Sequence, residues 1–219
     1  IAGRCVSRPP PAFAGHTLDR ADPVRSDPAR LAALAQRAAR LLRLEGLIPR
    51  LGDDERLQWG RLGEAEGAEI VFLGLLDGEP LFAAVPTEGD PDPAYTRRET
   101  FIALGVLPPD ELALYGGARS LLDWHARHRF CPQCGGATVL AKGGWQRDCS
   151  QCGAQQFPRT DPVTIMLVEH QGRVLLGRNA RFPGRSYSAL AGVVEPGETI
   201  EEAVAREVFE EAGVRVRDV

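Results

Sequence analysis

Residues 192–214 read GVVEPGETIEEAVAREVFEEAGV. The stretch opens with a loop rich in Gly and Pro and continues as a segment with helical spacing. Thr199 stands where a helix N-cap is expected, and Glu202 follows three residues later, which is the spacing of a capping box. Gly213 is placed to end the helix in a left-handed conformation. The stretch therefore predicts a loop followed by one firmly bounded helix.

The predicted helix combines an apolar stripe with closely spaced acidic side chains. Ile200, Val204 and Val208 recur every four residues and form the stripe. Glu207 and Glu211 each follow a stripe residue by seven positions, close to two helical turns, so we expect them along its edge. Carboxylates at such spacing repel one another, and their oxygens suit Mg²⁺ or Mn²⁺. A solvated acidic helix is the alternative interpretation.

The fixed positions of the stretch match a known pattern. They are Gly192, Glu198, Arg206-Glu207-Val208, Glu210-Glu211 and Gly213-Val214. The spacing resembles the Nudix box of Mg²⁺-dependent hydrolases that act on nucleoside diphosphates linked to another moiety. The resemblance implies that the catalytic glutamates Glu207 and Glu211, with Glu210 assisting, hold the metal, and that one of them is the base that accepts a proton from the attacking water. The Ala191 carbonyl is a further implied metal ligand, and we expect Arg206 to fix the loop by pairing with Glu198 and Glu202.

Four of the five cysteines form two C-x-x-C motifs separated by fourteen residues, namely Cys131 with Cys134 and Cys149 with Cys152. Two such knuckles make a tetrahedral Zn²⁺ site without an open ligand position, so the zinc should be structural. A redox dithiol is one alternative. A nucleic-acid-binding ribbon is another, because positive charge lies nearby, although the same residues serve equally well as helix-end charges: His125, Arg127, His128 and Arg129.

Composition narrows the class of protein further. The formal charge of −4 gives no overall attraction to nucleic acid or to an anionic membrane. No run of about 18 apolar residues is present, so we expect no membrane-spanning helix. Paired cysteines with the spacing of a metal site indicate a reducing compartment, and we expect a cytoplasmic protein.

Periodicity and turn signals predict an α+β protein with three domains. An N-terminal α+β domain over 1–128, a zinc ribbon over 129–156 and the first part of a Nudix α/β/α sandwich over 157–219 are expected. The predicted elements, in chain order, are an extended segment (1–26), a helix (28–40), a strand (41–51), a loop (52–69), a hairpin (70–76 and 80–85), a loop (86–94), a helix (110–128), a turn (157–162), a hairpin (163–169 and 173–178) and a final strand (214–219).

The order of these parts is similar to that of the NADH pyrophosphatase family, in which a ribbon, a Phe/Tyr-Pro-Arg-x-Asp-Pro segment and the Nudix box follow one another. Here the segment runs from Phe157 to Pro162. The resemblance implies Mg²⁺- or Mn²⁺-dependent cleavage of NADH or NAD⁺ into nicotinamide mononucleotide and AMP. It also implies removal of NAD caps from RNA by some members, and a homodimer. Phe157 replaces the common Tyr and would keep stacking on a base while losing a hydroxyl contact.

Two features of the family do not occur within the printed sequence. The motif Ser-Gln-Pro-Trp-Pro-Phe-Pro and a further metal-binding glutamate would follow the box, but the sequence stops at Val219, and it lacks an initiating Met. We therefore expect this chain to be part of a longer protein. Two other functions stay open: a Nudix hydrolase for another nucleotide such as ADP-ribose, and a nucleic-acid-binding ribbon protein with an inert Nudix domain.

Overall fold

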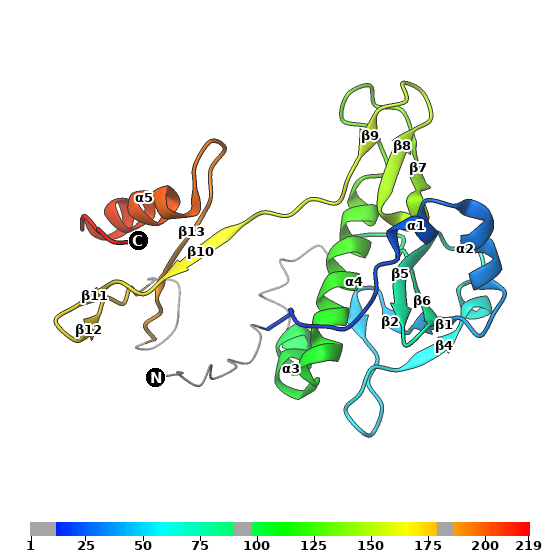
Figure 1. Cartoon of the computed structure of the whole chain (residues 1–219), viewed down its shortest axis with the longest axis horizontal. Coiled ribbons are helices and arrows are strands. Elements are labelled where there is room, and N and C mark those ends of the chain that lie inside the picture. Colours follow the sequence, from blue (N-terminus) through cyan, green and yellow to red (C-terminus); the bar gives the residue numbers. More distant parts are fainter. Residues whose placement is uncertain (1–11, 90–97, 179–185) are drawn as a thin grey trace, which may run out of the picture. The chain divides into compact units, whose positions relative to one another are not determined.

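The structure, a computed structural model, describes residues 12–89, 98–178 and 186–219 (Figure 1). They gather into two compact units, one ending at Pro158 and the other beginning at Arg159. Helices and strands are mixed in each unit, so the α+β class is confirmed. Within the described residues, none of the helices is long and apolar enough to cross a membrane. The part of the extended segment that covers residues 1–11, and the part of the loop that covers 90–94, lie outside the described residues.

A four-stranded sheet forms the centre of the first unit, in the order β4-β1-β6-β5. Its strands are β1 (Arg40–Leu42), β4 (Trp59–Arg61), β5 (Ile70–Leu76) and β6 (Glu79–Ala84). The predicted hairpin is confirmed as β5 and β6, which pair antiparallel. Both residues of its turn have positive φ, 51° at Asp77 and 81° at Gly78, as a two-residue Asp-Gly turn requires. A smaller hairpin, β2 (Leu44–Glu45) with β3 (Ile48–Pro49), extends beyond β1.

Four helices accompany this sheet: α1 (Asp22–Arg25), α2 (Pro28–Ala35), α3 (Arg98–Val106) and α4 (Pro109–Arg127). The Asp27 side chain caps α2 by accepting from the backbone of Ala29 and Arg30. The prediction of a helix up to residue 40 was too long, because Arg40 already pairs in β1 with β4 and β6. The long helix α4 matches its predicted range closely.

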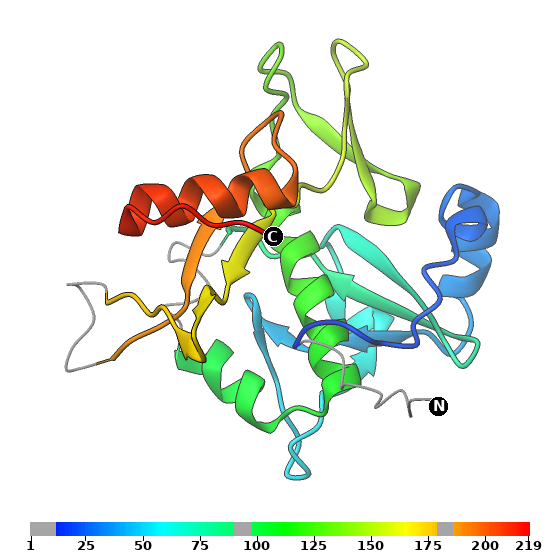
Figure 2. The same ribbon diagram turned by 60° about the vertical axis from the view of Figure 1, so that its left-hand side comes forward.

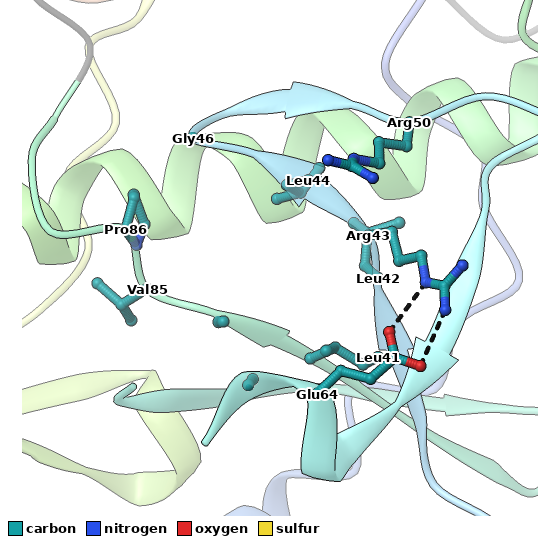
Figure 3. A pocket seen from close by; sticks show the side chains of 11 residues that line it. Leu41, Leu42, Arg43, Leu44, Gly46, Arg50, Glu64, Val85 and Pro86 are labelled. Carbon is teal, nitrogen blue, oxygen red and sulfur yellow. Dashed lines mark hydrogen bonds and ion pairs between the residues drawn. The ribbon is translucent and has the colours of Figure 1, made fainter. Parts of the chain in front are cut away.

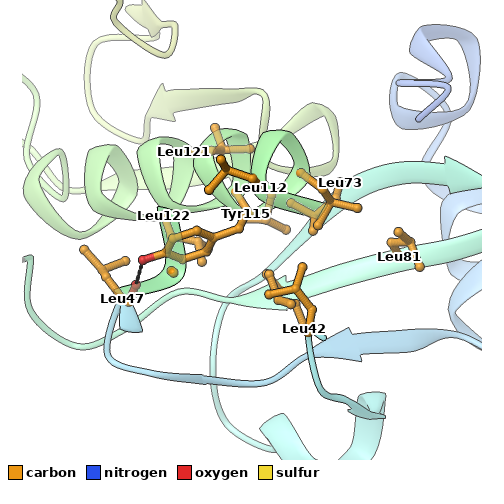
Figure 4. Packing of buried hydrophobic residues seen from close by; sticks show 14 of the residues in the cluster. Leu42, Leu47, Leu73, Leu81, Leu112, Tyr115, Leu121 and Leu122 are labelled. Carbon is orange, nitrogen blue, oxygen red and sulfur yellow. Dashed lines mark hydrogen bonds between the residues drawn. The ribbon is translucent and has the colours of Figure 1, made fainter. Parts of the chain in front are cut away.

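Helix α4 supplies much of the core of the first unit. Leu112, Tyr115, Leu121 and Leu122 of α4 are buried among leucines of the sheet (Figure 4). The Tyr115 hydroxyl donates a hydrogen bond of 3.0 Å to the Leu47 carbonyl, which satisfies its one polar atom inside the core. Each buried leucine contributes about 1.5–3 kcal/mol, so α4 holds the β2–β3 hairpin and the sheet together.

The predicted loop over residues 52–69 was wrong. This segment contains β4 and a short 3₁₀ helix, η1 (Leu62–Ala65). The polar composition of this segment gave no strand signal. Strand β4 is instead held by pairing with β1 and by the Arg40 guanidinium, which lies 4.4 Å from the centre of the Trp59 ring. These are tertiary contacts that no local pattern reveals.

The ribbon belongs to the first unit. Its strands are β7 (Thr138–Ala141), β8 (Gln146–Cys149) and β9 (Gln155–Gln156), with the 3₁₀ turn η3 (Lys142–Gly144) between the first two. Trp145 donates its indole N–H to the Phe72 carbonyl on β5 at 2.9 Å. The ribbon therefore packs on the four-stranded sheet, against which α4 also packs.

The second unit is built from β10 (Val163–Met166), β11 (Glu169–His170), β12 (Arg173–Val174), β13 (Leu190–Val193) and α5 (Ile200–Ala212). Strand β10 pairs antiparallel with β13, and α5 packs against both strands (Figure 2). The predicted hairpin is present but shorter, as β11 with β12 around Gln171 and Gly172. Buried Met166, Leu190 and Val208 form the core of this unit.

Two further expectations in this region were wrong. Residues 157–162 carry no hydrogen-bonded turn; they form a connection in which Arg159 Nε donates to Asp161 at 2.7 Å. Residues 214–219 form no strand, because no described strand pairs with them, although Val216 packs on the small core. Strands depend on a partner more than on local propensity.

Candidate functional site

The loop and helix of residues 192–214 adopt the predicted local structure. Glu202 donates its backbone N–H to the Thr199 hydroxyl at 3.2 Å, and the Glu202 carboxylate accepts from the Thr199 N–H at 2.8 Å. This reciprocal pair is the capping box. Gly213 ends α5 with φ of 67°. Both ends of the helix are thus fixed by the residues that the sequence singled out.

The buried face of α5 differs from the predicted stripe. Ile200 is 64% exposed, whereas Ala203 and Val208 are fully buried. The apolar cover of the helix includes Met166 and Leu190, and it leaves Ile200 exposed. The Glu202 carboxylate accepts from the backbone of Thr199 and makes no bond to Arg206. The expected pairing of Arg206 with Glu202 was therefore wrong.

Arg206 connects the loop to the carboxylates of the helix. Its Nε and Nη2 donate to the two oxygens of Glu198 at 2.6 and 3.0 Å, and Nη2 also donates to the Val193 carbonyl. Its Nη1 donates to Glu207 at 2.9 Å and to Glu210 at 3.1 Å. The guanidinium, helped by the Glu195 N–H, holds the pKa of the Glu198 carboxyl below its usual range. The predicted pairing of Arg206 with Glu198 is present and fixes the loop.

Gly192 allows the close approach of Glu207 to β13. A Cβ atom at Gly192 would overlap the Glu207 carboxylate group. Gly192 pairs with Thr164 of β10, and the Thr164 hydroxyl donates to the Gly192 carbonyl at 3.3 Å. Any larger residue at this position would push Glu207 away from the strand.

A cavity of about 400 Å³ lies beside these groups. Two of the four predicted metal ligands, Ala191 and Glu211, line it. Glu207 and Glu210 instead bond Arg206, with 15% and 57% of their side chains exposed. In the described part of the chain, the four cysteines are the one cluster of potential ligands close enough to share an ion. The three box carboxylates thus lie on one helix without converging on a single point.

These donors fit a hard divalent cation by their chemistry. Three carboxylates at positions i, i+3 and i+4 of α5 lie about one turn apart, and Ala191 of β13 lines the same cavity as one of them, Glu211. Such oxygen donors suit Mg²⁺, which binds through one or two carboxylates and keeps several waters. A site of this kind needs no dedicated cage of protein ligands.

The four ribbon cysteines converge as predicted. Their Sγ atoms all lie within 4.8 Å of one another, with 3.8 Å between Cys131 and Cys152 and 3.4 Å between Cys134 and Cys149. Tetrahedral zinc with Zn–S bonds of about 2.3 Å needs sulfurs about 3.8 Å apart. The N–H groups of Cys152 and Gln151 each donate to the Cys149 sulfur at 3.4 Å and lower the pKa of that thiol. The cluster fits a structural zinc ion.

The sequence pattern missed a buried polar network behind the ribbon. Arg147 of β8 donates two bonds of 3.0 Å to the Glu69 carboxylate and one of 3.0 Å to His125 Nδ1. His125 Nε2 lies 2.6 Å from the Gly144 carbonyl, so it carries the proton and the ring is neutral. Burial, joined by the Arg147 charge, lowers the pKa of His125 to about 4. His125 therefore adds no positive charge to the surface, contrary to one sequence-based alternative.

The first unit also contains a cavity, of about 450 Å³, between the β2–β3 hairpin, η1 and the end of β6 (Figure 3). Glu64 is the one carboxylate among the described residues that line it. Its two oxygens accept from Arg43 at 3.0 and 2.9 Å. This cavity offers no acidic cluster for a metal. Phe157, at the end of the same unit, is 58% exposed and available for stacking.

A four-cysteine ribbon followed by a helix-borne Nudix box defines a zinc-ribbon Nudix protein. The chain matches the NADH pyrophosphatase-like rudimentary NUDIX domain over residues 27–124, the NADH pyrophosphatase zinc ribbon domain over 126–157 and the NUDIX domain over 158–219. It belongs to the NADH pyrophosphatase family.

Three relatives illustrate the similarity. The NAD-capped RNA hydrolase NudC of Mycobacterium tuberculosis is 39% identical over 92% of this chain and 66% of its own length. The human NAD-capped RNA hydrolase NUDT12 is 38% identical over 82% of this chain. Nudix hydrolase 19, chloroplastic, of Arabidopsis thaliana is 48% identical over 50% of this chain. The chain spans 38% of the human relative and 26% of the plant relative.

Proposed function

We propose that the protein hydrolyses the pyrophosphate bond of NADH or NAD⁺, giving nicotinamide mononucleotide and AMP, and that it also removes NAD caps from RNA. The observation that carries this proposal is the ribbon followed directly by a complete Nudix box. Similarity to relatives named as NAD-capped RNA hydrolases, over 82% and 92% of the chain, supports the same substrate class.

Each box residue has a role in the proposed reaction. Glu207, Glu210 and Glu211, with the Ala191 carbonyl, would hold Mg²⁺ or Mn²⁺. When bound, such an ion neutralises the pyrophosphate and acidifies a water ligand. A box carboxylate accepts the water's proton. Arg206 keeps the loop at Glu198 in place, and Gly192 leaves room for Glu207.

The direct test compares substrates and a matched pair of variants in the full-length protein. Glu211→Gln should lower the rate of NADH cleavage by orders of magnitude, because it removes a charged ligand beside the cavity. Glu201→Gln, on the exposed side of the same helix, should leave the rate within a factor of about two. Melting curves of both variants should match the parent. Activity of Glu211→Gln within a few-fold of the parent would contradict the assigned role.

The substrate panel separates the proposal from its alternatives. Release of AMP and nicotinamide mononucleotide from NADH, NAD⁺ and NAD-capped RNA supports the proposal. Preferred cleavage of ADP-ribose would make the protein a Nudix hydrolase of another class. Salt-sensitive binding of uncapped RNA without any hydrolysis would support a ribbon-based nucleic-acid binder.

We further propose the division into domains at 1–128, 129–156 and 157–219, a cytoplasmic location and a homodimer. Four thiols that act as metal ligands support a reducing compartment. Light scattering on the full-length protein tests the dimer. The exposed ring of Phe157 supports a role in stacking on a substrate base.

A further inference from the structure

The cavity beside Glu211 has a wall that the Nudix box does not supply. Gly177 and Ser188 form an isolated antiparallel bridge, with backbone hydrogen bonds of 2.9 and 3.0 Å. Both residues line the cavity, and so does Arg178, the neighbour of Gly177. The chain thus brings a residue outside the box to the same hollow as Ala191 and Glu211.

The backbone at this wall is held by the core of the second unit. A Cβ atom at Gly177 would lie 2.7 Å from Leu190 Cδ2, so the chain passes directly over a buried core residue. Together with the bridge to Ser188, this contact fixes the backbone position of Gly177, the residue that precedes Arg178. A binding residue on such a support is positioned more accurately than one on a free loop.

The lining of the cavity contains one charged group of each sign. Among the described residues that line it, Glu211 is the one carboxylate and Arg178 the one cation. Arg178 has no ion-pair partner within the described part of the chain and is exposed. Its guanidinium presents donors in a planar fork that matches phosphate oxygens. A pyrophosphate bound through a metal at Glu211 would keep further oxygens that need hydrogen-bond donors.

We infer that Arg178 binds the pyrophosphate of the substrate in the cavity that Glu211 also lines, and so selects for diphosphate-linked ligands. This inference rests on the proposed function for the nature of the substrate. It adds a substrate-binding residue that lies outside the box and lines the same cavity as Glu211.

The test uses Arg178→Ala, Arg178→Lys and the control Arg173→Ala in the full-length protein. Arg173 is an exposed arginine of β12 that does not line the cavity. Calorimetric titration with inorganic pyrophosphate in the presence of Mg²⁺ measures binding without turnover. A charge-assisted bond contributes about 1.5–3 kcal/mol, so Arg178→Ala should weaken pyrophosphate binding roughly 10-fold to 100-fold. Lysine should restore part of the affinity, and the control should bind like the parent.

Kinetics and stability complete the test. With NADH, Arg178→Ala should raise KM more than it lowers kcat, and its melting temperature should equal that of the parent because the side chain is exposed. Pyrophosphate affinity unchanged in Arg178→Ala, or no pyrophosphate binding by the parent, would overturn the inference. If the parent cleaves no dinucleotide while Arg178 still governs pyrophosphate binding, the inference holds and the proposed function fails.

Discussion

At the scale of single residues, the absence of a side chain at Gly192 shapes the site as much as the acids do. A Cβ there would overlap the Glu207 carboxylate. We predict that Gly192→Ala displaces Glu207 and lowers NADH turnover of the full-length protein roughly 100-fold, the cost of a misplacement of about 1 Å. Steady-state kinetics measure this effect.

The control for this variant is Gly105→Ala, where a Cβ meets no atom within 4 Å. It should leave turnover unchanged. If Gly192→Ala keeps parental turnover, Glu207 tolerates displacement and cannot be a close metal ligand.

His125 makes the first unit sensitive to acid. Its pKa is lowered to about 4 in the folded chain, chiefly by burial, against an ordinary value of 6.5. The unfolded chain therefore binds this proton first, and stability falls as the pH drops from 6.5 to 4. We predict a loss on the order of 3 kcal/mol over this window, measured by urea unfolding at several pH values.

Direct titration separates His125 from other groups. Its imidazole resonances, followed by NMR, should show no transition between pH 8 and 5, because the pKa of His125 is lowered to about 4. A transition of His125 near pH 6.5 would contradict the buried neutral ring.

Among the contacts between elements, the ion pair between Arg147 of β8 and Glu69, just before β5, is the one whose loss should destabilise the first unit most. The Arg147 side chain is 2% exposed and that of Glu69 is 33% exposed. Removing one partner of a buried ion pair leaves the other charge uncompensated. We predict that Glu69→Ala lowers the free energy of unfolding by about 3 kcal/mol, the lower end for a buried pair because Glu69 is partly solvated.

Denaturant unfolding of the full-length protein checks this value, with Glu66→Ala as the matched exposed control. Equal stabilities of the two variants would mean that water reaches Arg147 and replaces the carboxylate.

Elements were predictable where the local pattern was sufficient. The β5–β6 hairpin, α4 and the ends of α5 follow from turn residues, apolar spacing and caps. Local patterns did not predict three other features: the early end of α2, the strand β4 and the lack of a strand over residues 214–219. Each of them depends on whether a distant strand is available for pairing.

The candidate site shows the same division. The sequence identified the box carboxylates, the loop contact of Arg206 and the cysteine cluster, since all lie in compact motifs. It missed Arg178, which reaches the cavity through the bridge from Gly177 to Ser188, and it missed the Arg147–Glu69 pair. Both depend on residues that are brought together only by the fold.

At the scale of the whole molecule, the ribbon and the N-terminal sheet should respond to zinc as one body. Trp145 and Arg147 connect the ribbon to β5 and to Glu69. We predict that chelation of zinc removes amide-exchange protection from β5 and β6 as well as from β7 and β8, and leaves α5 protected. Hydrogen exchange with mass spectrometry measures this, and zinc addition should restore protection. A loss of amide-exchange protection confined to β7 and β8 would contradict the prediction that the ribbon and the N-terminal sheet respond to zinc together.

The Arg147–Glu69 pair also has a consequence for synthesis on the ribosome. The two residues are 78 positions apart in the chain. At roughly 5–20 residues per second, Glu69 emerges about 4 to 16 s before its partner. During that interval the nascent sheet has neither its buried arginine nor the indole that donates to Phe72. The buried ion pair of the first unit therefore forms only after strand β8 of the ribbon has been synthesised.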